Sequence, residues 1–223
     1  MDSTTIFDFN LNNFFRYSTL VLLFVNTFLF FKSYNFFKRV IAFNVISLYL
    51  LLSLILNLIT LVFSYYQKDN LYLSHFYFIF QFLLLSIFYI NLFKTKHQKR
   101  LVQFLFISII LILGIQYALD YRKFFKYSLL EILITSFPLT IYSIIHLYNS
   151  LTTKGIYLYF NAAVLIYLTA TTLIFILGNY ITVIDKGLAR NIWFIHKVLY
   201  LVFLILTYLE WKNSFSSYKP KLQ

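Results

Sequence analysis

Residues 101–118 read LVQFLFISIILILGIQYA, a stretch with no charged side chain and with Gln103, Ser108 and Gln116 as its strongly polar positions. A helix needs about 20 mainly apolar residues to cross the roughly 30 Å hydrocarbon core of a bilayer. The residues do not alternate between apolar and polar, as they would in a strand of a membrane β-barrel. We therefore predict a transmembrane helix near 101–119.

The same pattern recurs on both sides of this stretch. Seven predicted spans lie near 13–31, 40–65, 71–93, 101–119, 127–149, 156–183 and 189–211. The first span is the weakest, because its continuous apolar run begins only after Arg16 and includes Asn26. The sequence thus predicts an all-α, polytopic membrane protein. A seven-transmembrane-helix bundle over 13–211 is expected to lie between a short segment, 1–12, and a basic tail, 212–223.

The composition supports this class. Hydrophobic residues make up 61% of the chain and charged residues 12%, whereas a soluble chain carries about 25% charged residues. The absence of cysteine excludes disulfides and thiolate metal sites. These values exclude P-loop and Rossmann enzymes and nucleic-acid modules. The net charge of +12 indicates membrane orientation, so we expect the lipid bilayer, and no nucleic acid, as a partner.

The basic residues are distributed unequally between the two predicted sides of the membrane. Eleven of the 19 fall on one side, in loops without acids: Lys32, Lys38, Arg39, Lys94, Lys96, Lys99, Arg100, Lys154, Lys212, Lys219 and Lys221. Cytoplasmic loops carry an excess of Lys and Arg. We therefore expect an outside N-terminus, a cytoplasmic C-terminus and a location in the bacterial cytoplasmic (inner) membrane.

With this topology, polar side chains from four predicted helices reach the outer third of the bundle: His75, Gln81, Glu131, Asn179 and His196. Ionisable groups inside spans are costly and usually face the bundle interior or water. We expect an outward-facing polar pocket, to which Tyr77, on the same helix face as Gln81, contributes. The alternative is that these groups only hold the helices together, at about 0.6 kcal/mol per hydrogen bond on average.

A metal site built from His75, Glu131 and His196 would have a plausible His₂-carboxylate composition. However, Tyr200 stands four residues after His196, so the His-x-x-x-His pair of seven-helix metal-dependent membrane hydrolases is missing. The sequence also lacks Ser-His-Asp, H-E-x-x-H and Gly-rich phosphate motifs. We expect no metal and no cofactor, and we rank Glu131 and His196 first among functional positions.

Several of these residues fall into a pattern. Residues 75–82, HFYFIFQF, resemble the string His-x-Tyr-x-x-x-Glu-Phe, and Leu130-Glu131, Asn161, Asn179 and IWFIH at 192–196 extend the likeness. Over roughly residues 30–212 the chain resembles a family of small, uncharacterised seven-helix membrane proteins of Bacteroidota-type bacteria, often encoded beside sensor histidine kinases. The resemblance implies a shared polar core of His75, Tyr77, Glu131, Asn179, Trp193 and His196. Gln81 stands where the family has Glu, so a carboxylate mechanism does not carry over to this position.

These observations favour a receptor-like or accessory subunit that binds a small or lipid-like ligand in the outer pocket. Because the predicted loops are too short to hold an output domain, it would act through a membrane protein partner such as a sensor kinase. One alternative is an intramembrane lipid-modifying hydrolase with Glu131 as general base. The other is a structural subunit of a larger membrane complex.

Overall fold

The computed structural model describes residues 3–70, 72–126, 128–152, 155–184 and 186–216. Within these ranges it does not describe the side chains of 3–10, 12, 152, 178–184, 186–191 and 193. The elements follow one another as α1 (Ser3–Phe37), α2 (Ile41–Tyr65), α3 (Leu73–Leu92), α4 (Lys96–Leu119), η1 (Tyr121–Phe125), α5 (Leu129–Thr152), α6 (Leu158–Ile184) and α7 (Lys186–Ser214). The described chain is all-helical, as predicted.

Seven of these helices are long and apolar enough to cross a membrane. The candidate spans are Asn13–Phe37, Ile41–Tyr65, Leu73–Leu92, Lys96–Leu119, Leu129–Leu151, Leu158–Leu177 and Phe194–Ser214. Each coincides with one predicted span, so the prediction of seven membrane-length helices is confirmed. The chain therefore has the architecture of a multi-pass membrane protein.

The ends of some elements differ from those predicted. Helix α4 begins at Lys96 because the Thr95 hydroxyl accepts a hydrogen bond from the Gln98 amide at 3.4 Å, as an N-cap. Lys96, Lys99 and Arg100 are thus part of a helix rather than of a loop, while Lys94 precedes it. Helix α1 reaches back to Ser3, into the segment 1–12 that we expected to precede the bundle. The short 3₁₀ helix η1 between α4 and α5 was not predicted.

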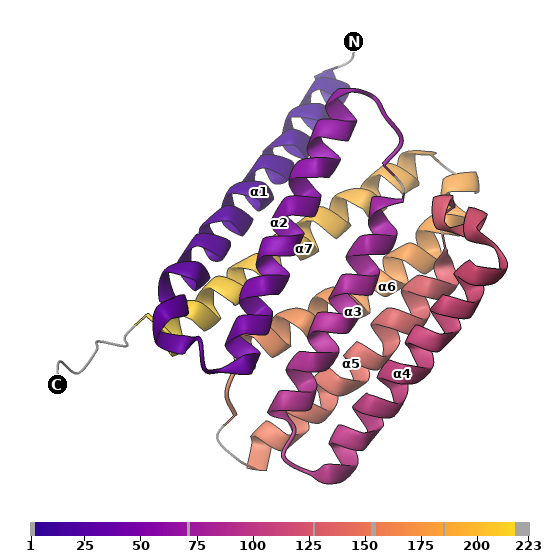
Figure 1. The fold of residues 1–223 in the computed structure, drawn as a ribbon. Helices are drawn as coiled ribbons and strands as arrows, with labels where there is room; N and C mark the ends of the chain where they lie inside the picture. Colours follow the sequence, from indigo (N-terminus) through magenta and orange to yellow (C-terminus); the bar gives the residue numbers. More distant parts are fainter. Residues whose placement is uncertain (1–2, 71, 127, 153–154, 185, 217–223) are drawn as a thin grey trace.

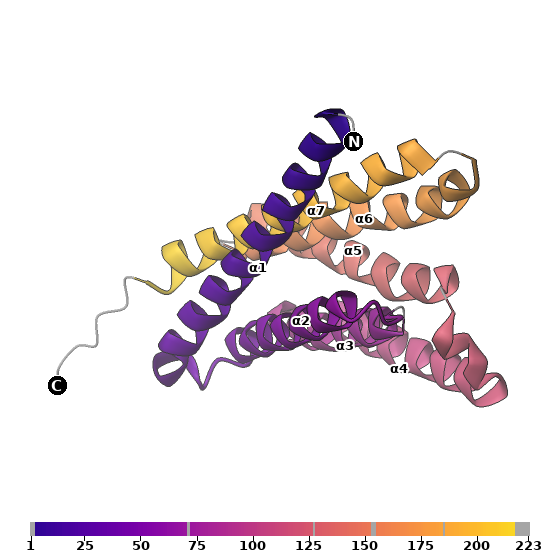
Figure 2. The same cartoon turned by 90° about the horizontal axis from the view of Figure 1, so that it is seen from above.

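The helices form two layers that are joined at one edge by α1. Consecutive helices run in opposite directions, which places the start of α1 and the end of α7 at opposite ends of the bundle (Figure 1). Seen from above, α2, α3 and α4 lie in one layer and α5, α6 and α7 in the other (Figure 2). Helix α1 packs against α2 of the first layer and α7 of the second, and α3 packs against α5. The helix axes of the two layers therefore approach each other most closely where α3 and α4 meet α5, and side chains such as Tyr77 and Tyr167 touch across the remaining space.

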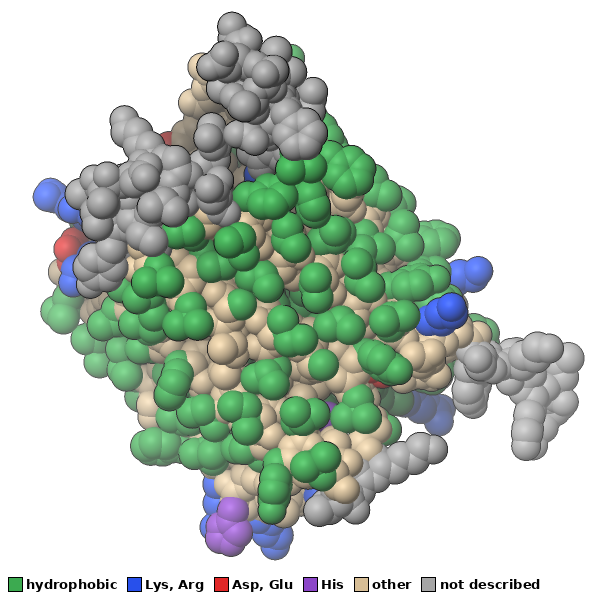
Figure 3. Space-filling view, turned by 180° about the vertical axis from the view of Figure 1, so that it is seen from behind, with side chains coloured by type: hydrophobic (Ala, Val, Ile, Leu, Met, Phe, Trp, Pro, Cys, Tyr) green, Lys and Arg blue, Asp and Glu red, His purple; other side chains and the backbone are tan. Residues whose placement is uncertain are grey.

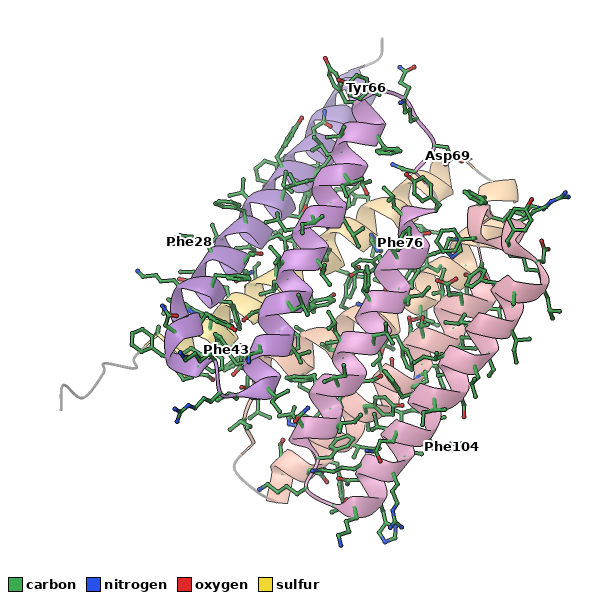
Figure 4. The ribbon with its side chains drawn as sticks, viewed as in Figure 1. Phe28, Phe43, Tyr66, Asp69, Phe76 and Phe104 are labelled. Carbon is green, nitrogen blue, oxygen red and sulfur yellow. The ribbon has the colours of Figure 1, made fainter. Side chains whose placement is uncertain are left out.

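The outer surface of the bundle is strongly apolar. Large hydrophobic side chains point outward from most helices; Phe28 on α1 is 59% exposed and Phe104 on α4 is 68% exposed (Figure 4). On the rear face, hydrophobic side chains cover the middle, and Lys and Arg side chains stand at the margins (Figure 3). A soluble monomer rarely exposes so large an apolar surface. This arrangement suits contact with a lipid bilayer.

Buried amide and hydroxyl groups connect the helices inside the bundle. The Asn26 side-chain amide of α1 donates to the Leu204 carbonyl of α7 at 2.9 Å. Fully buried Asn161 of α6 accepts hydrogen bonds at Oδ1 from the Tyr89 hydroxyl of α3, at 2.8 Å, and from the Ser143 hydroxyl of α5, at 3.0 Å. Its Nδ2 donates to the Ser143 carbonyl at 3.1 Å. Asn161 thus connects three helices.

We expect Asn161→Leu to lower the free energy of unfolding by about 1–2 kcal/mol, because it leaves the buried Tyr89 hydroxyl without its acceptor and the Ser143 carbonyl without the Asn161 amide donor. Denaturation of the micelle-bound protein with increasing SDS measures this loss. Asn91→Leu is the matched control, since Asn91 is exposed and donates only to the Ile87 carbonyl of its own helix. Similar losses for the two variants would contradict the connecting role of Asn161.

The start of α6 is capped by a side chain from another helix. Tyr157, just before α6, has a positive φ of 60°, and its ring lies between Phe88 and Phe215, with centroids 5.5 and 5.7 Å away. The carboxylate of Glu210 on α7 accepts hydrogen bonds from the first-turn amides of Tyr159, at 2.9 Å, and Phe160, at 3.3 Å. These are amides that an α-helix leaves without internal partners. A negative charge is also favoured at the positive end of the helix dipole.

Candidate functional site

His75, Glu131 and Tyr117 form a buried cluster at the N-terminal end of the bundle. His75 lies in the first turn of α3, Glu131 in the first turn of α5 and Tyr117 in the last turn of α4. His75 Nδ1 lies 2.6 Å from Glu131 Oε2, and the Tyr117 hydroxyl donates to the same oxygen. The Tyr117 hydroxyl also lies 3.1 Å from His75 Nδ1. The cluster therefore joins three helices.

The hydrogen-bond partners define the charge of this cluster. His75 Nε2 lies 2.9 Å from the Lys126 carbonyl, which can only accept, so Nε2 carries a hydrogen. The contact between Nδ1 and Glu131 Oε2 requires one further proton. Whether that proton sits on the imidazole or on the carboxyl group, the pair has no net charge. A neutral pair avoids most of the cost of a lone charge at membrane depth.

The connection between α4 and α5 covers this cluster. The Phe124 ring of η1 stacks on the His75 ring, with centroids 5.0 Å apart and planes inclined by 26°. The same ring meets Tyr117 edge-on at 5.5 Å. His75 and Glu131 are 2% and 0% exposed. Both side chains are therefore closed off from the surface, and the geometry favours a role in holding α3, α4 and α5 together.

A second polar cluster, the tyrosine cluster, lies between the two layers. It consists of Tyr49 on α2, Tyr77 and Gln81 on α3, Tyr167 on α6 and His196 on α7. The Tyr77 hydroxyl is 3.2 Å from that of Tyr49 and 3.5 Å from that of Tyr167, which lies 3.4 Å from His196 Nε2. Gln81 Nε2 donates to Tyr49, at 3.2 Å, and to Tyr77, at 3.4 Å. The cluster is thus a chain of uncharged groups able to donate and accept.

The tyrosine cluster borders a pocket of about 400 Å³, here called the interlayer pocket. Its polar lining includes Asn57, Tyr77, Tyr167, His196 and Tyr200. Its apolar lining includes Leu56, Leu73, Phe78 and Phe175. Pockets for small molecules in proteins span about 300–1,000 Å³ and combine an apolar lining with a few convergent polar groups. The interlayer pocket has both properties.

The structure separates the predicted site residues into two places. Tyr77 and His196 line the interlayer pocket. Gln81 does not line it but donates a hydrogen bond to the Tyr77 hydroxyl. His75 and Glu131 belong to the other cluster and do not line the interlayer pocket. Nor do they line a second pocket, which lies between α1, α2 and α7. Glu131 contacts His75, not His196, the residue that we ranked beside it. The side chains of Asn179 and Trp193 lie outside those that the structure describes.

Three participating tyrosines were not singled out from the sequence: Tyr49, Tyr117 and Tyr167. Each is one of 20 tyrosines in a chain with 28 phenylalanines, so composition gave no reason to choose it. The three-ligand metal set considered from the sequence is not assembled. Among the described residues, no three His, Asp or Glu side chains gather closely enough to share an ion.

The fold and these two clusters define the chain as a multi-pass membrane protein with a polar pocket between its helix layers. Comparison with protein-family models, curated proteins and solved structures finds no match. The resemblance to the seven-helix bacterial family therefore stays a prediction.

Proposed function

We propose that this protein is a receptor-like or accessory membrane protein that binds an amphipathic small molecule in the interlayer pocket. The observation that carries the proposal is the pairing of the tyrosine cluster with an apolar wall in one pocket of about 400 Å³. The hydroxyl and imidazole groups suit an oxygen-bearing head, and Leu56, Phe78 and Phe175 suit a hydrocarbon part.

The position of the pocket supports a role in signalling. It lies between α2–α3 and α6–α7, so its occupant contacts both layers at once. A ligand that binds one relative placement of the layers more tightly than another shifts the population towards that placement. The connections between the described helices are short. The output therefore passes to a partner in the membrane, and we propose a sensor kinase as that partner.

The charge distribution supports an orientation for this proposal. The end of the bundle with the basic connections after α1, α3 and α5 faces the cytoplasm, following the positive-inside rule. The interlayer pocket then opens towards the outer leaflet of the bacterial cytoplasmic membrane, since Asn70 and Ser74, near the start of α3, line it. Lipid hydrolysis receives less support, because the Glu131 carboxylate is engaged by His75 and Tyr117.

Photolabelling tests the proposal. In nanodiscs of neutral phosphatidylcholine, a diazirine-bearing dodecanol is expected to label wild-type protein saturably, on peptides from the four helices that line the pocket. Leu56→Trp places a larger side chain in the pocket wall. We expect it to reduce saturable labelling about tenfold, since the ligand then competes with a filled volume.

Leu58→Trp is the matched control, because Leu58 lies two residues further along α2 and is 45% exposed on the outer surface. It should label as the wild type does. Thermal unfolding of all three proteins checks that each is folded. Labelling that does not saturate, or that is equal in Leu56→Trp and Leu58→Trp, would refute binding in the interlayer pocket.

A further inference from the structure

Helices α1 and α7 lie side by side and run in the same direction, towards the end of the bundle where both of them end (Figure 1). Three contacts along the pair share one register: Asn26 Nδ2 to the Leu204 carbonyl at 2.9 Å, Trp211 Nε1 to Ser33 Oγ at 3.0 Å, and the Phe37 and Phe215 ring centroids at 5.0 Å. In each contact the two residues are 178 positions apart in the chain. This constant difference fixes how the last turns of the two helices face each other.

The register places two lysines on one side of the helix pair. Lys32 is the residue before Ser33, and Lys212 is the residue after Trp211. Successive residues of an α-helix are rotated by about 100° around its axis. A residue before the contact on one helix and a residue after the contact on a parallel neighbour therefore turn to the same side. Both lysines are exposed, so one anion can be reached from both helices.

The charge around these two lysines is positive. The connections at this end of the bundle, 38–40, 93–95 and 153–157, and residues 211–223 contain neither Asp nor Glu. Glu210, the residue before Trp211, turns to the opposite side of the pair by the same rule. Its carboxylate accepts hydrogen bonds from the first-turn amides of α6. The partner that suits this corner of the bundle is therefore an anion.

The depth of the lysines indicates where the anion comes from. Lys32 and Lys212 lie within the last two turns of their candidate membrane spans. Towards the middle of the bilayer the same helix faces carry exposed apolar side chains, Phe28 one turn before Lys32 and Ile205 two turns before Lys212. Lysines near a span end lay their stems on apolar surface and extend their ammonium groups to the headgroups. A phospholipid supplies both the anion and the hydrocarbon that this surface suits.

We propose that Lys32 and Lys212 bind the phosphate of an anionic phospholipid of the phosphatidylglycerol class, whose acyl chains lie along the outer surface of α1 and α7. The phosphate accepts charge-assisted hydrogen bonds from both ammonium groups. Phosphatidylcholine carries the same phosphate together with a cation that offsets its charge, so it binds more weakly. This lipid site goes beyond the proposed function, because it does not involve the interlayer pocket.

Fluorescence quenching by brominated lipids tests the site, because bromine quenches tryptophan only at short range. The chain has two tryptophans, so Trp193→Phe leaves Trp211, beside the lysine pair, as the only reporter. The half-buried Trp211 side chain is partly open to lipid. In phosphatidylcholine vesicles, brominated phosphatidylglycerol is expected to quench this protein at an about tenfold lower mole fraction than brominated phosphatidylcholine does.

Two double variants in the Trp193→Phe protein locate the preference. Lys32→Gln/Lys212→Gln is expected to abolish it, so that the two brominated lipids quench equally. Lys94→Gln/Lys96→Gln is the matched control, since it removes two exposed lysines before and at the start of α4, at the same end of the bundle. It changes the net charge equally and should keep the preference. Circular dichroism and thermal unfolding check that all three proteins are folded.

Equal quenching by the two lipids in the Trp193→Phe protein would overturn the site. A preference that persists in Lys32→Gln/Lys212→Gln, or that falls equally in both double variants, would show general attraction to surface charge instead. Inorganic phosphate, added at constant ionic strength, should leave the quenching unchanged. Relief of quenching by inorganic phosphate would assign the lysines to a soluble anion and contradict the lipid.

Discussion

Replacing Glu131 with leucine is expected to lower the free energy of unfolding by about 3 kcal/mol, the magnitude typical of breaking one half of a buried pair. The side chain is fully buried, and its Oε2 serves both His75 Nδ1 and the Tyr117 hydroxyl. Leucine fills a similar volume but leaves both groups without this acceptor. Thermal unfolding and SDS titration in micelles measure the loss.

Two further variants separate the effect of the lost hydrogen bonds on the free energy of unfolding from the effect of the changed side-chain volume. Glu131→Gln places one atom, either oxygen or nitrogen, at the shared Oε2 position, so it satisfies either the Tyr117 hydroxyl or neutral His75 but not both, and the loss should be about half that of Glu131→Leu. His75→Leu/Glu131→Leu removes both partners, and its loss should be clearly smaller than the sum of the two single losses. Equal losses in Glu131→Gln and Glu131→Leu, or strict additivity in the double variant, would disprove the pairing.

Replacing Glu210 with alanine is expected to cost about 2–3 kcal/mol and to act locally on α6. Capping side chains are worth about 0.5–2 kcal/mol, and each buried amide left without a partner adds to the loss. Glu210 is 1% exposed, so water does not readily replace it. Hydrogen exchange followed by mass spectrometry should show faster exchange of the Tyr159 and Phe160 amides, with amides in the middle of α3 unaffected.

Glu210→Gln is the informative second variant, because an amide oxygen at the Oε2 position can accept both hydrogen bonds without the negative charge. It should recover more than half of the lost stability. Ser214→Ala is the control for the neighbourhood, since the Ser214 hydroxyl donates to the other carboxylate oxygen, Oε1, at 2.5 Å. Unchanged exchange at the start of α6 in Glu210→Ala would show that the carboxylate does not cap this helix.

The helices were predictable from sequence, because length and hydropathy decide where a chain can span a bilayer. The predicted span 40–65 and the helix Ile41–Tyr65 agree within one residue. Prediction was weaker where polar residues extend a helix. The run from Lys96 to Arg100 is helical because Thr95 caps it, while an apolar criterion starts only at Leu101.

The arrangement of the site was less predictable, because these helices are apolar on several faces and their sequences do not fix which face meets which neighbour. The sequence predicted that His75 and Glu131, on different helices, lie at one level of the bundle, and the two side chains are in contact. The sequence did not predict which helices are neighbours. Helix α5 packs against α3 and α6, and α6 lies between α5 and α7, which keeps Glu131 away from His196.

The cap at the start of α6 has a consequence for how the chain is made. Glu210 is near the end of α7, so the first turn of α6 remains incomplete until the ribosome has synthesised α7 as well. During that interval the Tyr159 and Phe160 amides depend on water or on lipid headgroups. Helices α6 and α7 therefore mature as one hairpin, in which the later helix completes the first turn of the earlier one.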